Sequence, residues 1–264
     1  MQHGNARARV EAVQTAIRRP TGLLPLSCGF QQEQSGSRRA DHRGVGALGA
    51  RRKTVADSRR SAGREAIEIV EWWRSEHAKP LSRVAANLRY YAEEHGKPVV
   101  AQRLKKAPTI SHKLLREPNM KLSRMADIGG VRAVLPTQEA AYVVARHLRK
   151  NWTITRFRDY VAEPKADGYR ALHLINRNHG RLIEVQLRTP RQDLWANGVE
   201  TFARTIAPAL KFGGGPSDLR GYFLALGELF EVRDQGLEIE TALLDRVENL
   251  QQRADTLWKE RNEP

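Results

Sequence analysis

Apolar side chains recur three and four positions apart in two early segments of the chain. They are Ala66, Ile69, Val70 and Trp73, followed after Pro80 by Leu81, Val84, Ala85 and Leu88. Because this spacing places side chains on one face of a helix, it predicts two amphipathic helices that pack on a core. Two shorter helices are predicted at 99–105 and 111–116, the second ending before Pro118.

The apolar pattern changes in the middle of the chain. Residues 128–135 are typical of a buried strand, and residues 140–149 return to helical spacing. Three further strands are predicted at 153–161, 170–176 and 181–188. Asn178-His-Gly180 is a turn signal that joins the last two strands as a hairpin.

The last part of the chain is predicted to be helical. Helical spacing covers 195–206, the glycine-rich segment 211–216 interrupts it, and 219–261 is predicted to form a hairpin of two helices. A stripe in the second helix suggests that it packs on another element, such as a second subunit; it comprises Leu243, Val247, Leu250 and Leu257. These patterns predict an α+β fold in which helices flank a mixed β-sheet.

Positive charge is the main compositional feature. The formal net charge is +15, of which residues 61–216 carry +12, and such an excess favours a polyanionic partner. Residues 1–61 are basic and lack periodicity, so we expect a disordered arm, or else one that binds nucleic acid. We place the main domain at 62–210 and a C-terminal helical segment at 217–264. The single cysteine, Cys28, and the lack of a long apolar run favour a cytoplasmic protein without a membrane partner.

Two carboxylates lie on predicted strands. Asp127 opens the segment Asp-Ile-Gly-Gly-Val-Arg, and Glu184 lies within Ile-Glu-Val-Gln-Leu-Arg. If their strands bring them to one edge of the sheet, they could hold Mg²⁺, which binds a few carboxylates together with phosphate oxygens. A structural salt bridge to Arg132 or Arg170 is the alternative, and the residues alone do not favour either.

A basic cluster precedes the first carboxylate and comprises Arg103, Lys105, Thr109 and Lys113. Cations with a hydroxyl and backbone N–H groups at a helix start could hold phosphates. On composition alone, an ordinary solvated helix end is the simpler interpretation.

An aromatic and a histidine lie between the two carboxylates in the sequence. Tyr169 follows Gly168 among charged residues, a setting that suits stacking on a base, although a tyrosine at a strand edge is more often structural. A lone histidine such as His173 is more often a hydrogen-bonded structural residue than a catalyst.

Taken together and in order, these motifs resemble the synthetase domain of the RelA/SpoT family, most closely its small single-domain members and their toxin relatives. The motifs are Arg103-x-Lys105-x-x-x-Thr109-Ile110-x-x-Lys113, Asp127-Ile-Gly-Gly-Val-Arg132, Tyr160-x-x-x-Pro-Lys165-x-x-Gly-Tyr169-Arg170-x-x-His173, Glu184-Val-Gln186-x-Arg188-Thr and Asp193-x-Trp-Ala. The resemblance covers residues 64–206. It implies a nucleotidyltransferase-like synthetase fold and a pyrophosphokinase that transfers the β,γ-pyrophosphate of ATP to a ribose 3′-hydroxyl.

The resemblance also implies roles for the matched residues. Arg103, Lys105, Thr109 and Lys113 would bind ATP. Asp127 and Glu184 would bind Mg²⁺, and Glu184 would also take the proton from the attacking hydroxyl. Tyr169 would stack on the acceptor base. The acceptor would be positioned by Lys165, Arg170, His173, Gln186, Arg188 and Asp193.

The sequence departs from the family pattern at a few positions. Thr109 stands where serine is usual, which keeps the hydroxyl. Thr201 follows Glu200 where the family often has histidine, which puts the acceptor side in doubt. Long members of the family carry a hydrolase domain with a His-Asp pair. This chain has only Asp41-His42, in reverse order, so no hydrolase activity is expected.

The acceptor is left open by the sequence. GDP or GTP would give ppGpp or pppGpp, whereas the toxin branch modifies the 3′ CCA end of tRNA or an adenine nucleotide. The charge of +12 in residues 61–216 fits an RNA acceptor. A toxin would have an antitoxin protein as partner, and the C-terminal helices could contact it or form a homo-oligomer. The alternative from another class is a non-catalytic RNA-binding module that retains the fold.

Overall fold

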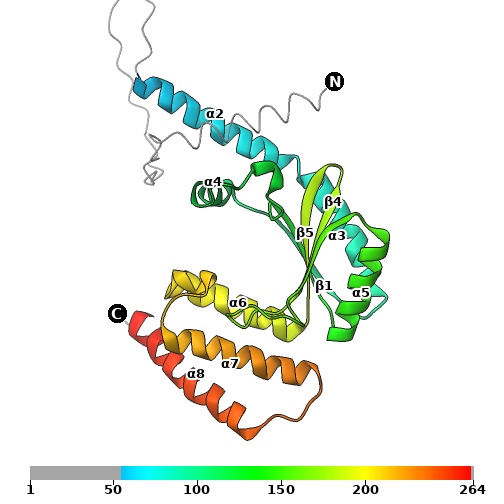
Figure 1. Ribbon diagram of the computed structural model, residues 1–264, viewed down its shortest axis with the longest axis vertical. Coiled ribbons are helices and arrows are strands. Elements are labelled where there is room, and N and C mark those ends of the chain that lie inside the picture. The colour runs from blue at the N-terminus through cyan, green and yellow to red at the C-terminus, as the bar shows by residue number, and fades with distance from the viewer. Residues whose placement is uncertain (1–54, 263–264) are drawn as a thin grey trace, which may run out of the picture. The chain divides into compact units, whose positions relative to one another are not determined.

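The computed structural model describes residues 55–262 as two compact units (Figure 1). Of the described residues, the first unit contains 55–73 and 107–123, and the second contains 74–106 and 124–262. Most of the predicted basic arm lies outside the described residues. The chain is already helical at Val55, earlier than the expected onset of order near residue 62.

The first unit consists mainly of two helices. α2 (Val55–Ser75) buries Ala66, Val70 and Trp73, as the helical spacing predicted. α4 (Ala107–Arg116) buries Ala107, Ile110 and Leu114, and it begins four residues before its predicted start. A short 3₁₀ turn, η1 (Leu122–Arg124), follows.

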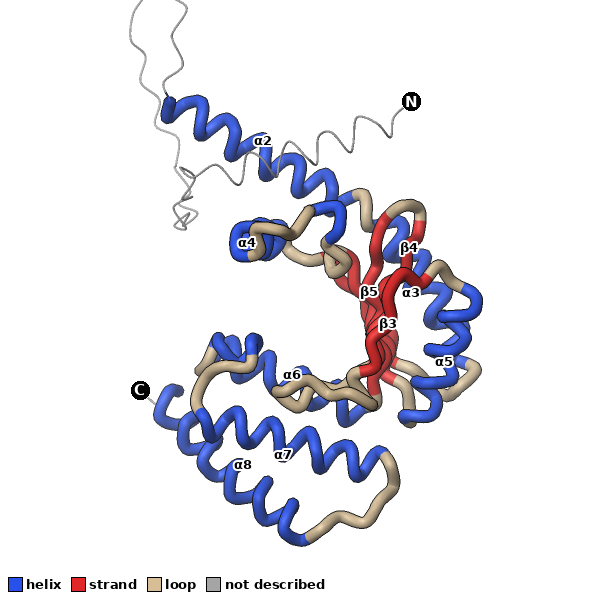
Figure 2. Tube along the Cα trace, in the orientation of Figure 1, coloured by secondary structure: helices blue, strands red, loops and turns tan. Residues whose placement is uncertain are grey.

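A mixed five-stranded sheet forms the centre of the second unit and confirms the predicted α+β class. Its strands are β1 (Val99–Leu104), β2 (Gly129–Val134), β3 (Ile154–Asp159), β4 (Leu172–Asn178) and β5 (Arg181–Arg188). The spatial order is β1-β2-β5-β4-β3; β2 runs parallel to β5 and the other neighbours are antiparallel. Figure 2 shows these strands in red.

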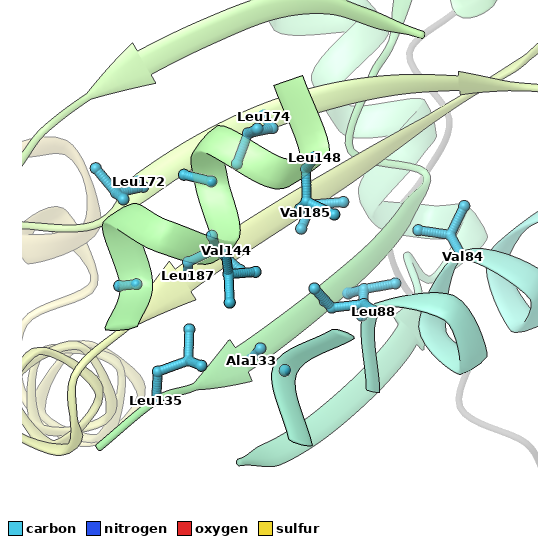
Figure 3. Packing of buried hydrophobic residues seen from close by; sticks show 14 of the residues in the cluster. Val84, Leu88, Ala133, Leu135, Val144, Leu148, Leu172, Leu174, Val185 and Leu187 are labelled. Carbon is cyan, nitrogen blue, oxygen red and sulfur yellow. The ribbon is translucent and has the colours of Figure 1, made fainter. Parts of the chain in front are cut away.

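Helices of the second unit are α3 (Ala78–Glu93), α5 (Gln138–Asn151), α6 (Pro190–Thr205), α7 (Ser217–Asp234) and α8 (Thr241–Asn262), with a 3₁₀ turn η2 (Pro208–Phe212). α3 and α5 contact one face of the sheet. Figure 3 shows Leu88 of α3 and Val144 of α5 packed with Ala133, Val185 and Leu174 of the strands. Since side chains alternate along a strand, the residues between these core positions point to the opposite face.

The helix predicted at 99–105 is wrong, because this segment is the edge strand β1. Its residues pair with the whole of β2, from Val99 opposite Val134 to Leu104 opposite Gly129. A six-residue segment with adjacent valines forms few helical hydrogen bonds by itself, whereas pairing satisfies the N–H and C=O groups along the free edge of β2. The correction places Arg103 on a sheet face instead of a helix.

The hairpin predicted at Asn178-His-Gly180 is confirmed. Asn178 pairs with Arg181, so His179 and Gly180 alone form the turn, with φ of 46° and 74°. Positive φ at both central residues is typical of a type I′ turn, whose twist matches that of the flanking strands.

The C-terminal segment is the predicted helical hairpin. Val247 and Leu250 of α8 pack with Ala225 and Leu229 of α7, and Leu257 packs with residues of α6 and α7. The apolar stripe of α8 therefore packs within the same chain rather than requiring a second subunit. No described helix is long and apolar enough to cross a membrane.

Candidate active site

The face of the sheet opposite α3 and α5 carries polar side chains in two rows. Hydrogen-bonded strands align Arg103 of β1, Gly130 of β2 and Glu184 of β5 in the first row. The second row contains Arg132, Gln186, His173 and Arg158, from β2, β5, β4 and β3. The register thus brings together residues that are separated by more than 50 positions in the sequence.

The two predicted carboxylates lie close to each other at this face. Asp127 lies two residues before β2, and its negative charge is the smallest of the influences on the pKa of Glu184, opposing the net lowering of that pKa. Lys105 Nζ lies 2.7 Å from Asp127 Oδ2 and forms an ion pair with it. Gly130 of β2 lies opposite Glu184 of β5, and a Cβ added at Gly130 would meet no heavy atom within 4 Å. There is therefore open space on the sheet face beside Glu184.

A closed ring of hydrogen bonds surrounds the Glu184 carboxylate. His173 Nδ1 lies 3.2 Å from Glu184 Oε1, and Gln186 Nε2 donates to Oε2 at 2.8 Å. Arg188 donates to Gln186 Oε1 at 2.8 Å and to the Tyr169 hydroxyl at 3.0 Å. The Tyr169 hydroxyl lies 2.6 Å from His173 Nε2, which completes the ring.

One protonation pattern satisfies every contact of this ring. Burial raises the pKa of Tyr169 in spite of the charge of Arg188, so the hydroxyl keeps its proton and donates to His173 Nε2. The histidine then carries a proton on Nδ1 and donates it to Glu184. Burial would raise the pKa of Glu184, but the hydrogen bonds from His173 and Gln186 outweigh it and hold the pKa below its usual value. Glu184 is therefore ionised at neutral pH.

Lys165 and two tyrosines form the outer wall of the site. Lys165 Nζ lies 4.7 Å from the centre of the Tyr169 ring and 4.8 Å from that of Tyr160. The Tyr160 ring meets His173 edge to face at 5.1 Å. Tyr169 is half-buried; its hydroxyl belongs to the ring of hydrogen bonds, and its aromatic ring meets Trp195 edge to face at 5.9 Å and lies 5.4 Å from the Arg188 guanidinium.

Asp193 links this network to α6. Arg132 and Arg188 each place a guanidinium nitrogen 3.0 Å from Asp193 Oδ1, and Asn197 donates to Oδ2 at 3.0 Å. Arg132 also lies 3.4 Å from Asn197 Oδ1. Sequence reasoning assigned no site role to Arg132, Asn197 or Tyr160. Strand alternation from Gly130 indicates the face of Arg132, but only the sheet register shows which residues it adjoins.

Three predicted site residues have other surroundings or belong to the other unit. Arg170 donates to Val161 O at 3.0 Å and its Nε lies 3.5 Å from Glu231 of α7, so its side chain is engaged away from Glu184. Thr109 is exposed and Lys113 half-buried on α4, in the first unit. Their roles in binding ATP remain predictions.

Residues 102–204, which contain most of these side chains, match the region found in RelA / SpoT proteins. This part of the chain is similar to the RelA/SpoT region. GTP pyrophosphokinase YjbM of Bacillus subtilis is 32% identical over 120 residues, which are 40% of this chain and 56% of YjbM. Protein Rv1366 of Mycobacterium tuberculosis is 30% identical over 158 residues, 58% of this chain and 55% of Rv1366. The chain thus spans about half the length of these relatives.

Solved structures show the same fold for the part of the chain that contains this region. Small alarmone synthetase 2 of Bacillus subtilis aligns with a TM-score of 0.50 and 24% identity, over 60% of this chain and 90% of that one. A GTP pyrophosphokinase family protein of Streptococcus pneumoniae aligns with a TM-score of 0.51 and 21% identity, over 63% and 90%. The synthetase fold implied by the sequence motifs is confirmed.

Asp127 and Glu184 offer the type of oxygen donor that Mg²⁺ takes. This ion typically takes one or two protein carboxylates and completes its shell with water and phosphate oxygens. Asp127 and Glu184 offer such a pair beside the open space at Gly130. Among residues 55–262, no group of three or more His, Cys, Asp or Glu could hold a metal ion.

The lowered pKa of Glu184 predicts a pH-dependent contribution to stability. A group whose pKa is lower in the folded than in the unfolded state stabilises the fold above its unfolded pKa and loses that contribution as pH falls through the folded pKa. The free energy of unfolding should therefore fall less steeply below pH 4.5, the ordinary value for this carboxyl, in Glu184→Gln than in the wild type. Urea unfolding in buffers with EDTA between about pH 6 and pH 3 measures this difference. Equal slopes in the two proteins would contradict the prediction.

Proposed function

We propose that this chain is an ATP-dependent 3′-pyrophosphokinase without hydrolase activity. The observation that carries the proposal is the ionised Glu184 of β5, held by His173 and Gln186, with Asp127 in the turn that precedes the neighbouring strand β2. In the proposed reaction, the acceptor 3′-oxygen attacks the β-phosphorus of ATP. The bond from that phosphorus to the bridging oxygen of the α-phosphate breaks, and AMP leaves.

The side chains of the site supply charge and position for this reaction. Lys105, which pairs with Asp127 in the structure, would turn to the phosphates when ATP is bound. Positioning and electrostatic stabilisation provide most of the acceleration in phosphoryl transfer. Bound Mg²⁺ would neutralise charge that develops on the phosphates. Asp127 and Glu184 would hold that ion.

Glu184 is suited to orient the attacking hydroxyl. Its lowered pKa makes the carboxylate a weak base, because a general base works best with a pKa near the working pH. A fixed, ionised carboxylate accepts a hydrogen bond from the 3′-hydroxyl in every turnover and can receive its proton as the bond to phosphorus forms. We infer that positioning contributes more than basicity at this residue.

A guanine nucleotide is the first candidate acceptor. The relative YjbM is named a GTP pyrophosphokinase, and Tyr169 presents its ring beside Lys165 where a base could stack. The 3′ CCA end of tRNA is the second candidate. It is favoured by Arg156 and Arg158 of the edge strand β3, which are exposed on the same face as His173 and could contact a nucleic-acid backbone.

An acceptor assay tests the proposal. The protein is incubated with Mg²⁺ and ATP labelled in the γ-phosphate, together with GDP, GTP or deacylated tRNA. Label in ppGpp or pppGpp alone would exclude tRNA, and label in tRNA alone would exclude the guanine nucleotides. No labelled product with any of them would reject the pyrophosphokinase and favour the non-catalytic RNA-binding module, which a filter-binding assay with tRNA would then check.

We further propose a toxin role if tRNA is the acceptor. Expression should then stop growth, Glu184→Gln should restore it, and an antitoxin protein would be the partner. Size-exclusion chromatography of the full chain tests the proposed homo-oligomer, whose elution should not match a single 29.9 kDa chain.

A further inference from the structure

We propose that α7 supports the candidate active site and sets the spacing of Tyr169 and Arg188, with Gly227, Glu231 and Asp234 as positioning residues. None of the three belongs to the matched RelA/SpoT region, which ends at residue 204. The inference concerns the geometry of the acceptor side, and its kinetic part rests on the proposed function.

The loop that presents Tyr169 has a rigid internal turn. Gly168 N donates to Lys165 O at 2.8 Å, and Tyr169 N donates to the Asp167 side chain at 3.0 Å. Gly168 adopts φ +89°, a conformation that residues with a side chain rarely adopt. This turn defines the shape of the loop but not its place in the domain.

The back of the loop lies directly on α7. A Cβ at Gly168 would lie 3.2 Å from Leu224 Cα and 3.3 Å from Phe223 O, and a Cβ at Gly227 would lie 2.9 Å from Gly168 O. Two glycines thus allow loop and helix backbones to meet. A glycine within a helix lowers the stability of the helix by about 1 kcal/mol relative to alanine. At Gly227 the close contact with the loop offsets this loss. Trp195 donates to Phe223 O at 2.6 Å beside this contact.

The next turns of α7 contact Arg170 and Thr189, the residues that follow Tyr169 and Arg188. Glu231, one turn after Gly227, lies 3.5 Å from Arg170, the residue after Tyr169. Asp234 accepts a hydrogen bond from Thr189 Oγ1 at 2.5 Å, and Thr189 is the residue after Arg188. Both carboxylates are largely buried, with side-chain exposures of 12% and 5%. One helix face therefore contacts the side chains of the residues that follow Tyr169 and Arg188, the two partners of the hydrogen bond.

A matched pair of glycine variants tests the contact. Gly227→Ala should push Gly168 away, because its Cβ would lie within 3.0 Å of a carbonyl oxygen. Gly221→Ala is the control on the same helix, where a Cβ would meet Leu250 at an ordinary 3.5 Å. Hydrogen–deuterium exchange of the full chain should accelerate about tenfold in peptides covering 160–170 for Gly227→Ala, with the core strands unchanged. It should stay at the wild-type rate for Gly221→Ala.

Kinetics separate positioning from general stability. We expect Gly227→Ala to lower kcat/KM for the acceptor about 10- to 100-fold while KM for ATP changes less than about twofold. Glu231→Gln is the milder second variant and should also lower kcat/KM for the acceptor, by less than Gly227→Ala does. Glu228→Gln is its control, because Glu228 pairs with Arg246 of α8 and not with the loop.

The outcomes distinguish the two proposals. Unchanged hydrogen–deuterium exchange at 160–170 in both Gly227→Ala and Glu231→Gln would overturn the role of α7. Equal losses of kcat/KM for ATP and for the acceptor would do the same. If the wild type transfers nothing to any acceptor but exchange responds as expected, the proposed function fails and the support of the loop by α7 stands.

Discussion

Glu184→Gln is expected to lower pyrophosphate transfer about a thousandfold or more while the protein remains folded. The substitution keeps the size of the side chain but removes the negative charge that His173 and Gln186 hold in place. Loss of one preorganised electrostatic contact costs about 10²- to 10³-fold in catalysis, and this side chain is also one of two proposed Mg²⁺ ligands. Single-turnover transfer from labelled ATP measures the effect.

The matched control is Glu76→Gln. Glu76 is a half-exposed carboxylate that pairs with Arg181. Arg181 is the first residue of β5, and Arg188 is the last. We expect it to keep wild-type transfer. Activity of Glu184→Gln within about tenfold of the wild type would show that the carboxylate is not part of the reacting centre, because no preorganised contact of this kind is so weak.

Arg188→Ala is expected to lower the free energy of unfolding by about 3 kcal/mol or more. The guanidinium is 8% exposed and bonds to Tyr169, Gln186 and Asp193. Removing it leaves the partly buried Asp193 carboxylate with one cation fewer. It also breaks the ring of hydrogen bonds that orients Glu184. Urea unfolding at pH 7 measures the loss, and transfer should fall together with it.

Two further arginine variants define the origin of this loss. Arg188→Lys keeps the charge but cannot form the same fork of hydrogen bonds, so its stability should lie between those of wild type and Arg188→Ala. Arg253→Ala removes an exposed arginine that pairs with exposed Asp218, and it should cost less than about 1 kcal/mol. Equal effects of Arg188→Ala and Arg253→Ala would refute the structural role of the buried guanidinium.

Local patterns predicted most of the secondary structure. The spacing of Ala141, Val144, Ala145 and Leu148 predicted α5, and all four side chains are buried. The turn at His179-Gly180 was recognisable because its chemistry is local. The strand β1 was missed because its conformation depends on pairing with β2, a partner about 30 residues away that gives no signal within the segment.

The candidate site was predicted in composition but not in arrangement. The motifs singled out Glu184, His173 and Tyr169, and the structure joins them through hydrogen bonds. Arg170 was grouped with them because the resemblance to the family motif implies a role in positioning the acceptor. Its side chain instead contacts Glu231, a residue 61 positions away on a helix that no motif includes.

By itself the sequence determined the α+β class and the resemblance to the RelA/SpoT family, and it named candidate site residues, because motifs and apolar periodicity are properties of neighbouring residues. Only the tertiary structure decided which side chains share one face of the sheet, since register and strand order align positions far apart in the chain. The contact between the Tyr169 loop and α7 is also visible only in the structure, because a close approach of Gly168 and Gly227 leaves no pattern in the sequence.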